Sequence, residues 1–308
     1  MTTRFYFHPV CIEHEPAPGH PESPARLRTI AEVLADPAFD DLERHSPPQA
    51  KREHLPLVHP EDYVAKVFDL VPTEGTSRID ADTLMSPKSG EAALRAAGAL
   101  VDAVDAVMTG AADNAFCAMR PPGHHAEPTQ GMGFCLFNSV AIGAEHARQA
   151  HGAERVAVMD FDVHHGNGTQ AMFWNEPGLF YASTHQWPLY PGTGDKNETG
   201  AHGTIANAPL WPGAGSDDFR TAMRDVVLPA MKNFGPDLIL ISAGFDAHRR
   251  DPLAQLSLET EDFAWATDEL RRLAEAVCGG RVVSTLEGGY DLKALGESAA
   301  AHVGVLMG

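Results

Sequence analysis

Short apolar runs recur along the chain, and half of them contain several β-branched residues. A continuous apolar run of this length, bounded by turn residues, is typical of a strand that is buried on both faces of a sheet. We therefore expect six strands, at residues 4–8, 115–119, 155–161, 179–183, 237–242 and 281–286.

Longer segments between these runs carry apolar residues at helical spacing. They predict helices at residues 91–108, 138–150, 217–234 and 260–277. In the third helix the apolar face is expected to include Val226. Strands that alternate with helices indicate the α/β class, here a three-layer αβα arrangement around a mostly parallel sheet with right-handed crossovers.

Composition sets limits on this picture. The chain has 308 residues, of which 44% are hydrophobic, and no repeat, low-complexity tract or linker divides it. We therefore expect a single domain over residues 1–308. No apolar stretch approaches the roughly 18 residues of a membrane span, and the first residues do not resemble a secretion signal. The four cysteines form no CxxC pair, so a reducing, cytoplasmic location is expected.

The formal net charge is −19. A nucleic-acid partner is not expected, because phosphate contacts need a basic face. The charge is compatible with a cationic partner, such as a lysine-rich protein or a polyamine, but the simpler explanation is solubility alone. It carries no indication of the oligomeric state.

Polar, glycine-rich segments follow four of the predicted strands. These segments are RPPGHHA, DVHHGNG, AGFDAH and EGGYD. Because ligands in parallel α/β sheets bind beyond the carboxyl ends of the strands, the four segments are expected to meet at one edge and to form a site there.

The segment VMDFDVHHGNG, residues 158–168, carries the densest set of ionisable groups. If the strand continues through it, alternation projects Asp160, Asp162 and His164 to one side. A catalytic zinc site needs three protein ligands and one open position, and Asp246 in AGFDAH could complete such a set. The alternative is a group of hydrogen-bonded residues that closes the strand, but buried carboxylates need a partner charge or a metal.

Two other segments carry candidate catalytic groups. His124 and His125 lie on a loop restricted by proline and glycine. Alone, such a pair is typical of a surface loop, but beside a metal it suggests a general base and a second imidazole that stabilises charge. In EGGYD, two glycines let the backbone approach a site closely, so that Tyr290 could donate to an oxyanion rather than pack in the core.

Together these segments resemble the zinc-dependent histone deacetylase family, within the arginase/deacetylase superfamily. The motifs GHPESPARL, RPPGHHA, GMGFCLFN, DFDVHHGNGTQ, PGTG, AGFDAHRRDPL and EGGYDL occur in the family's order over almost the whole chain. The asparagine in HHGNGTQ is similar to class II and bacterial members. The resemblance implies the arginase/deacetylase fold, one deacetylase domain, and hydrolysis of acetyl or other acyl groups from the lysine ε-amine.

The resemblance also implies roles for individual residues. One zinc ion per chain would be held by Asp162, His164 and Asp246. The catalytic residues would be His125 as general base, His124 as the second imidazole, Tyr290 as oxyanion donor, Asp160 orienting His124, and Asn167 orienting His125 in place of an aspartate.

A structural potassium ion and a substrate channel are implied in the same way. Potassium would be held by Asp160, Ser183 and backbone carbonyls around Asp162, His164 and Thr184. The channel would be lined by Gly133, Phe134, Tyr190 and Leu253, with Asp82 near the substrate backbone and Arg26 at an internal acetate-exit cavity.

Three other functions remain open. A binuclear manganese ureohydrolase shares the fold but needs an aspartate where this chain has His248. An acetylpolyamine amidohydrolase often has an acidic gatekeeper where this chain has Leu253. A catalytically silent acyl-lysine binder replaces the tyrosine that is retained here as Tyr290. The expected substrate is an acyl-lysine protein or peptide, with an acetylated polyamine as the alternative.

Overall fold

The computed structural model covers residues 1–308 and is built around an eight-stranded sheet in the order β2–β1–β5–β10–β9–β6–β7–β8. Its strands are β1 (Thr3–Tyr6), β2 (Glu43–His45), β5 (Asn114–Cys117), β6 (Val156–Asp160), β7 (Leu179–Gln186), β8 (Ile205–Leu210), β9 (Leu238–Ala243) and β10 (Val282–Leu286). Every pairing in this sheet is parallel. All six predicted strands belong to it. A separate antiparallel pair joins β3 (Ser77–Arg78) to β4 (Leu84–Met85).

The two strands that the apolar pattern did not predict, β2 and β8, form the two edges of the sheet. The sequence of β2 is ERH, and β8 contains both Asn207 and Pro209. An edge strand has only one neighbour, so it can accommodate a proline and lacks the continuous apolar run of a central strand. For this reason neither strand stands out in the sequence.

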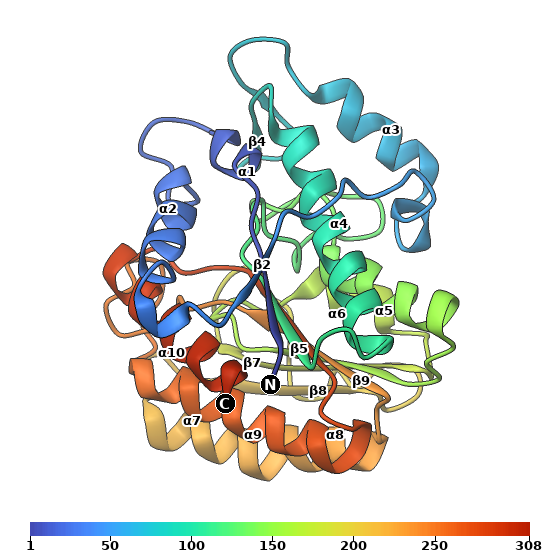
Figure 1. Ribbon diagram of the computed structural model, residues 1–308, viewed down its shortest axis with the longest axis vertical. Helices are drawn as coiled ribbons and strands as arrows, with labels where there is room; N and C mark the ends of the chain where they lie inside the picture. The colour runs from blue at the N-terminus through green and yellow to red at the C-terminus, as the bar shows by residue number, and fades with distance from the viewer.

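Helices cover both faces of the sheet and complete three layers, as Figure 1 shows. They are α1 (Val10–Glu13), α2 (Pro24–Val33), α3 (Glu61–Leu70), α4 (Ser89–Met108), α5 (Ser139–His151), α6 (Asn167–Phe173), α7 (Ser216–Ala222), α8 (Leu228–Phe234), α9 (Thr260–Cys278) and α10 (Leu292–Met307). In the figure α4, α5 and α6 lie above the sheet, while α7, α8, α9 and α10 lie below it. The predicted αβα class is confirmed.

The helix expected at residues 217–234 is interrupted. A π-helical segment, Met223–Val227, separates α7 from α8. The wider turn rotates the following residues, so Val226 is 41% exposed instead of joining the apolar face, and that detail of the expectation was wrong. Pro229, at the start of α8, has no N–H to continue the α-helical hydrogen-bond ladder, which favours a break at this place.

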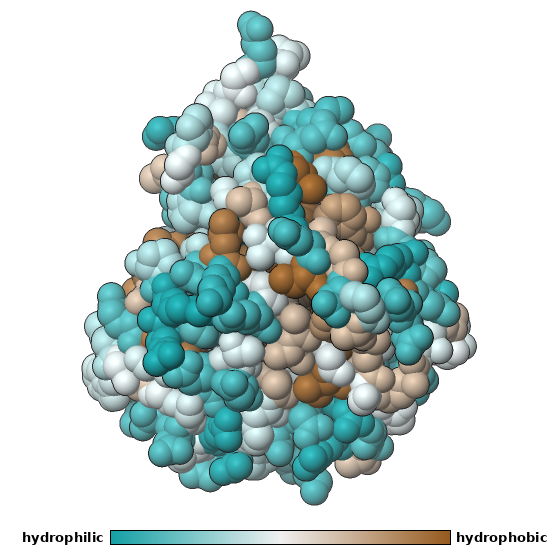
Figure 2. Space-filling view, turned by 60° about the vertical axis from the view of Figure 1, so that its left-hand side comes forward, coloured by the Kyte–Doolittle hydropathy of each residue, from teal (hydrophilic) through white to brown (hydrophobic).

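The apolar core holds the strand ends in fixed positions. A large cluster spans the sheet and its flanking helices, and a smaller one, which includes Tyr63, Val67 and Phe137, lies where α3, α4 and α5 meet. No helix is long and apolar enough to cross a lipid bilayer. The face in Figure 2 is mostly hydrophilic, with small hydrophobic areas separated by polar residues.

Candidate active site

The four polar segments follow neighbouring strands of the sheet, β5, β10, β9 and β6, and therefore lie at one edge of it. Three of the segments contribute His125, His164 and Tyr290 to a cavity of about 100 Å³, and the fourth brings Asp246 to Asp162 and His164. The cavity is lined by Asp82, His125, Gly133, Phe134, His164, Tyr190, Leu253 and Tyr290. The convergence expected from the sequence is therefore present.

The strand that leads to the densest segment is shorter than expected. β6 ends at Asp160, and Asp162 and His164 lie in the bend that follows it. The idea that strand alternation points all three side chains to one side was wrong. The bend brings Asp162 and His164 to Asp246, whereas the carboxylate of Asp160 turns toward His124.

Asp162, His164 and Asp246 form a compact group in which the two aspartates are buried and His164 is partly exposed, and their ligand atoms all lie within 4.8 Å of one another. Nδ1 of His164 is 3.0 Å from Asp162 Oδ1 and 3.2 Å from Asp246 Oδ2. Asp246 Oδ2 is buried and, although it is within ion-pair distance of His164, it accepts no hydrogen bond. Two carboxylates and one imidazole that converge on one point, with one oxygen left unsatisfied, fit a divalent zinc ion.

Backbone N–H groups hold the two carboxylates in place. Gly288 donates to Asp162 Oδ2 over 2.7 Å, and Val163 donates to Asp246 Oδ1 over 2.9 Å. In each carboxylate one oxygen is thereby fixed and the other faces His164. Burial, followed by the negative charge of Asp162, raises the pKa of Asp246 to about 7. The fold thus concentrates negative charge that a cation would relieve.

Gly288 gives the first testable consequence of this packing. A Cβ at this position would lie 2.5 Å from Asp162 Oδ2 and 2.8 Å from Asp246 Cγ. We expect Gly288→Ala to displace the carboxylates, to lower the free energy of unfolding by about 1–3 kcal/mol and to weaken the binding of any divalent metal ion between them. Thermal unfolding and metal analysis would measure both effects.

Gly304→Ala is the matched control for Gly288→Ala. Gly304 lies in α10, and nothing lies within 4 Å of a Cβ placed there. This variant should be as stable as the parent or up to about 1 kcal/mol more stable, because alanine favours helices. Equal stability and zinc content in the two variants would refute the close approach at Gly288.

The two histidines of RPPGHHA have different partners. His124 Nδ1 lies 2.9 Å from Asp160 Oδ2, and His125 Nδ1 lies 2.8 Å from Asn167 Oδ1. Burial alone would lower the pKa of His124, but the charges of Asp160 and Asp162 outweigh it and raise that pKa to about 10. Burial and then the neighbouring His124 hold the pKa of His125 well below its usual value.

The consequence is a division of roles between adjacent imidazoles, whose ring centroids are 4.0 Å apart. His124 carries positive charge, whereas His125 stays neutral. Because the Nδ1–H of His125 donates to the amide oxygen of Asn167, its Nε2 lone pair is free to accept a proton. Titratable neighbours whose pKa values are driven apart are typical of acid–base sites.

Three positioning carboxylates lay outside the residues singled out in the sequence. Glu287 accepts hydrogen bonds from the N–H groups of Gly123 and His124, and so fixes the histidine loop. Asp251 accepts from the N–H of Tyr290 over 2.7 Å. Glu127 accepts from the side-chain amide of Asn167 over 2.8 Å. Only Glu287 carried a signal in the sequence, because it follows the buried strand β10 directly and precedes the two glycines.

Arg26, which the resemblance places at an internal acetate-exit cavity, is absent from the lining of the channel cavity. It is fully buried, donates to the carbonyl of Gly289 over 2.7 Å and pairs with Glu22 over 3.1 Å. Its guanidinium lies 4.9 Å from the ring centroid of Tyr290. Arg26 therefore lies against the ring of Tyr290. Burial raises the pKa of Tyr290 well above its usual value, and the positive charge of Arg26 partly offsets this effect.

The channel wall contains a strained residue. Phe134 is the one non-glycine residue with a positive φ, at 69°. The preceding N–H, of Gly133, donates to Asp82 Oδ1, and the N–H of Phe134 donates to Thr83. Such strain persists where the surroundings hold it, often beside a binding site. Asp82 thus has a visible role in shaping the wall.

The residues expected at a potassium site lie on neighbouring strands. Asp160 in β6 is in register with Ser183 in β7. The hydroxyl of Ser183 is 2.9 Å from His185 Nδ1, while the buried hydroxyl of Thr184 has no partner. Adjacent side chains in a strand point to opposite faces. Thr184 could therefore contribute a ligand to an ion beside Ser183 only through its backbone carbonyl.

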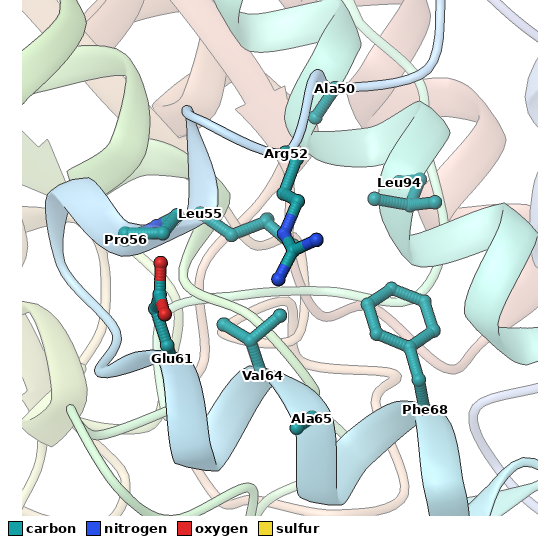
Figure 3. Close-up of a pocket in the computed structure, with 9 residues that line it drawn as sticks. All are labelled: Ala50, Arg52, Leu55, Pro56, Glu61, Val64, Ala65, Phe68 and Leu94. Carbon is teal, nitrogen blue, oxygen red and sulfur yellow. The ribbon is translucent and has the colours of Figure 1, made fainter.

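A larger cavity, of about 290 Å³, lies between the 3₁₀ segment Leu55–Leu57, α3 and α4. Figure 3 shows its mostly apolar wall, with the side chain of Arg52 extending into the middle of the labelled residues and that of Glu61 to one side. Its lining contains no histidine and none of the metal-ligating groups of the chain. The smaller cavity beside His125 is therefore the candidate active site.

Comparisons with known proteins find similarity over almost the whole chain. The model of the histone deacetylase domain matches residues 20–306. The histone deacetylase-like amidohydrolase of Pseudomonas aeruginosa is 40% identical, with 94% of this chain and 82% of that protein aligned. Histone deacetylase 14, chloroplastic, of Arabidopsis thaliana is also 40% identical, over 94% and 73% of the two chains. The crystal structure of the HDA15 HD domain superposes with a TM-score of 0.92 at 36% identity, covering 99% of this chain and 88% of that one.

Proposed function

The chain belongs to the histone deacetylase family, and on that basis we propose that it is a zinc-dependent amidohydrolase that removes acetyl or other acyl groups from lysine side chains. We take residues 1–308 as one catalytic domain. The observation that carries the proposal is the meeting of Asp162, His164 and Asp246 beside a neutral His125, with His125 and His164 lining one cavity.

Asp162, His164 and Asp246 would hold the zinc ion. When bound, zinc polarises an amide carbonyl and makes water a better nucleophile. Two carboxylates and one imidazole offset the charge of the ion, so the water still needs a base. His125 takes its proton through Nε2 while Asn167 holds the opposite nitrogen.

The remaining groups stabilise charge. The hydroxyl of Tyr290 stays protonated, because burial raises its pKa, and it donates to the oxyanion that forms at the substrate carbonyl. Cationic His124 adds positive charge beside this site. The proton accepted by His125 then passes to the leaving lysine amine, so that a free amine and a carboxylate are released.

Asn167→Asp tests the assignment of the base. A carboxylate at this position would stabilise the imidazolium of His125 and raise its pKa. More of the base is then protonated at a given pH, so the acid limb of the kcat/KM profile should move to higher pH. A pH–rate profile of both proteins measures the shift, with His165→Gln as the control because His165 contacts Thr193 and Gln170 instead. An acid limb that stays in place would remove His125 from this role.

Asp160 and Ser183, with the carbonyl of Thr184, are proposed to hold a structural potassium ion. Asp160 also accepts hydrogen bonds from Tyr181 over 3.0 Å and from the N–H of Asp162 over 3.1 Å. A monovalent ion at this position would therefore support both the orientation of His124 and the bend that carries the zinc ligands.

A binuclear ureohydrolase is disfavoured by the position of His248. Its Nδ1 accepts a hydrogen bond from the backbone N–H of Arg250, and it does not join the group formed by Asp162, His164 and Asp246. The site thus provides a single set of ligands.

The substrate is proposed to be an acyl-lysine peptide or protein. Leu253 lines the cavity at the position where polyamine-directed relatives often have an acidic gatekeeper, so this position has no acidic side chain that would select a polyamine. The alternative is an acetylated polyamine, favoured by the net charge of −19. The test compares kcat/KM for an acetyl-lysine peptide, longer acyl-lysine peptides and acetylspermidine with the same enzyme. Faster hydrolysis of acyl-lysine supports the first substrate, whereas a dominant rate on acetylspermidine would establish the second.

A further inference from the structure

A second group of metal-ligating side chains lies away from the active site, between α4 and α5. Asp105 is near the end of α4, and His146 and His151 belong to α5. Nε2 of each histidine is 2.6 Å from the same oxygen, Asp105 Oδ1. One carboxylate oxygen therefore already lies at the meeting point of two imidazoles.

A third imidazole flanks this group. The ring centroid of His54 lies 5.4 Å from that of His146. The backbone N–H of Lys51 donates to Nδ1 of His54 over 3.3 Å. Nε2 of His54 makes no hydrogen bond to the protein. His54 comes from a segment remote in sequence from both helices, so three parts of the chain supply these nitrogen and oxygen ligands.

The group is both accessible and ordered. The side chain of Asp105 is 48% exposed, whereas those of His146 and His151 are 12% and 17% exposed. An ion from solvent can reach the carboxylate, while packing holds the imidazoles. No lysine or arginine pairs with Asp105, whose ion-pair partners are the two histidines alone.

We propose that Asp105, His146 and His151 form a second site for a borderline divalent ion such as Zn²⁺, with His54 as a further ligand. Imidazole and carboxylate together suit zinc and its neighbours among the transition metals. Bonds of about 2.0–2.2 Å to a tetrahedral ion place ligand atoms roughly 3.3 Å apart. The present 2.6 Å separations thus need only a small outward movement of each ring.

The position of this site in the fold indicates what it does. α4 and α5 pack side by side (Figure 1), and their last turns precede β5 and β6. The site therefore lies toward the amino ends of these strands, whereas the catalytic segments follow the carboxyl ends. An ion here would link the two helices and stabilise the fold without entering the reaction.

The test compares the wild-type protein with His146→Gln/His151→Gln after equilibrium dialysis against Zn²⁺ and removal of the loose metal. The glutamine amides can still donate to Asp105, so the helix contact is kept. We expect the wild type to retain one more zinc ion per chain than the variant and to show a Tm that rises further with added Zn²⁺. Deacylation rates should be equal. His202→Gln, which removes an exposed histidine outside the group, should behave like the wild type.

The difference in zinc content between the two proteins decides the proposal, so the result is independent of whether the active site itself holds zinc. Equal zinc content in wild type and variant, at any total, would overturn it. If the double variant proves unstable, Asp105→Asn provides the second comparison, and it too must lose one ion. Zinc-dependent stabilisation that persists in both variants would likewise count against the site.

Discussion

Asp246→Asn is expected to remove zinc from the active site and to abolish deacylation, while the protein remains folded. Replacing a residue that hydrogen-bonds to a metal ligand costs about 10–100-fold in metal affinity. Loss of a ligand itself should therefore cost more than about 100-fold. The amide keeps the oxygen that accepts from Val163, so the backbone around it should not move. Metal analysis and an acetyl-lysine assay measure the two losses.

Although Asp246→Asn should abolish zinc binding and activity, it should make the zinc-free protein more stable. Burial and the charge of Asp162 raise the pKa of Asp246 to about 7, above the value of about 3.9 for an unfolded chain. A carboxyl with a raised pKa costs the folded state stability as the pH rises through that range. At pH 8 the zinc-free variant should therefore melt at a higher temperature than the zinc-free parent. A lower Tm would show that the carboxylate stabilises the empty site.

Asp102→Asn serves as the control for this variant. Asp102 lies on α4 and accepts a hydrogen bond from Tyr6 over 2.7 Å, away from the active-site cavity. Its replacement should leave both zinc content and activity unchanged. Zinc loss in both proteins would mean that Asp246 has no special part in metal binding.

Tyr290→Phe should lower kcat by about 100- to 1,000-fold, with zinc content unchanged. The hydroxyl contributes only when negative charge develops on the substrate oxygen, and removing one such donor costs roughly 3–4 kcal/mol. KM should change little, because the ring remains against Phe134 and Arg26. Steady-state kinetics and metal analysis separate this outcome from loss of the ion.

Tyr63→Phe is the matched control for Tyr290→Phe. The hydroxyl of Tyr63 donates to the carbonyl of Leu136 over 2.7 Å and does not line the cavity. The free energy of unfolding should fall by about 1 kcal/mol, as for a typical lost hydrogen bond, with kcat close to that of the parent. Equal activities of the Tyr63 and Tyr290 variants would refute an oxyanion role for Tyr290.

The sequence predicts the centre of this fold well and its periphery poorly. Central strands such as β6 and β9 are apolar on both faces and are therefore visible as continuous runs. The edge strands β2 and β8 are partly polar because they pair on one side only. The π turn at Met223–Val227 depends on how one helix packs, which apolar spacing does not record.

The candidate site could be located but not constructed from sequence alone. The motifs after four strands identify the edge, since parallel topology brings carboxyl ends together. The bend after Asp160 and the carboxylates of Asp251 and Glu127 could not be inferred, because their partners are backbone or amide groups distant in the chain. The assigned roles remain predictions for the variants described above.

Reconstitution with zinc tests the proposed function most directly. The protein for this experiment is the variant His146→Gln/His151→Gln, so that only the active site binds the added ion. It is stripped with a chelator, dialysed and assayed on an acetyl-lysine peptide before and after addition of Zn²⁺. A zinc-dependent deacetylase should lose its activity on stripping and regain it at about one zinc ion per chain. Full activity of the stripped protein, or restoration only by a pair of manganese ions, would contradict the mechanism.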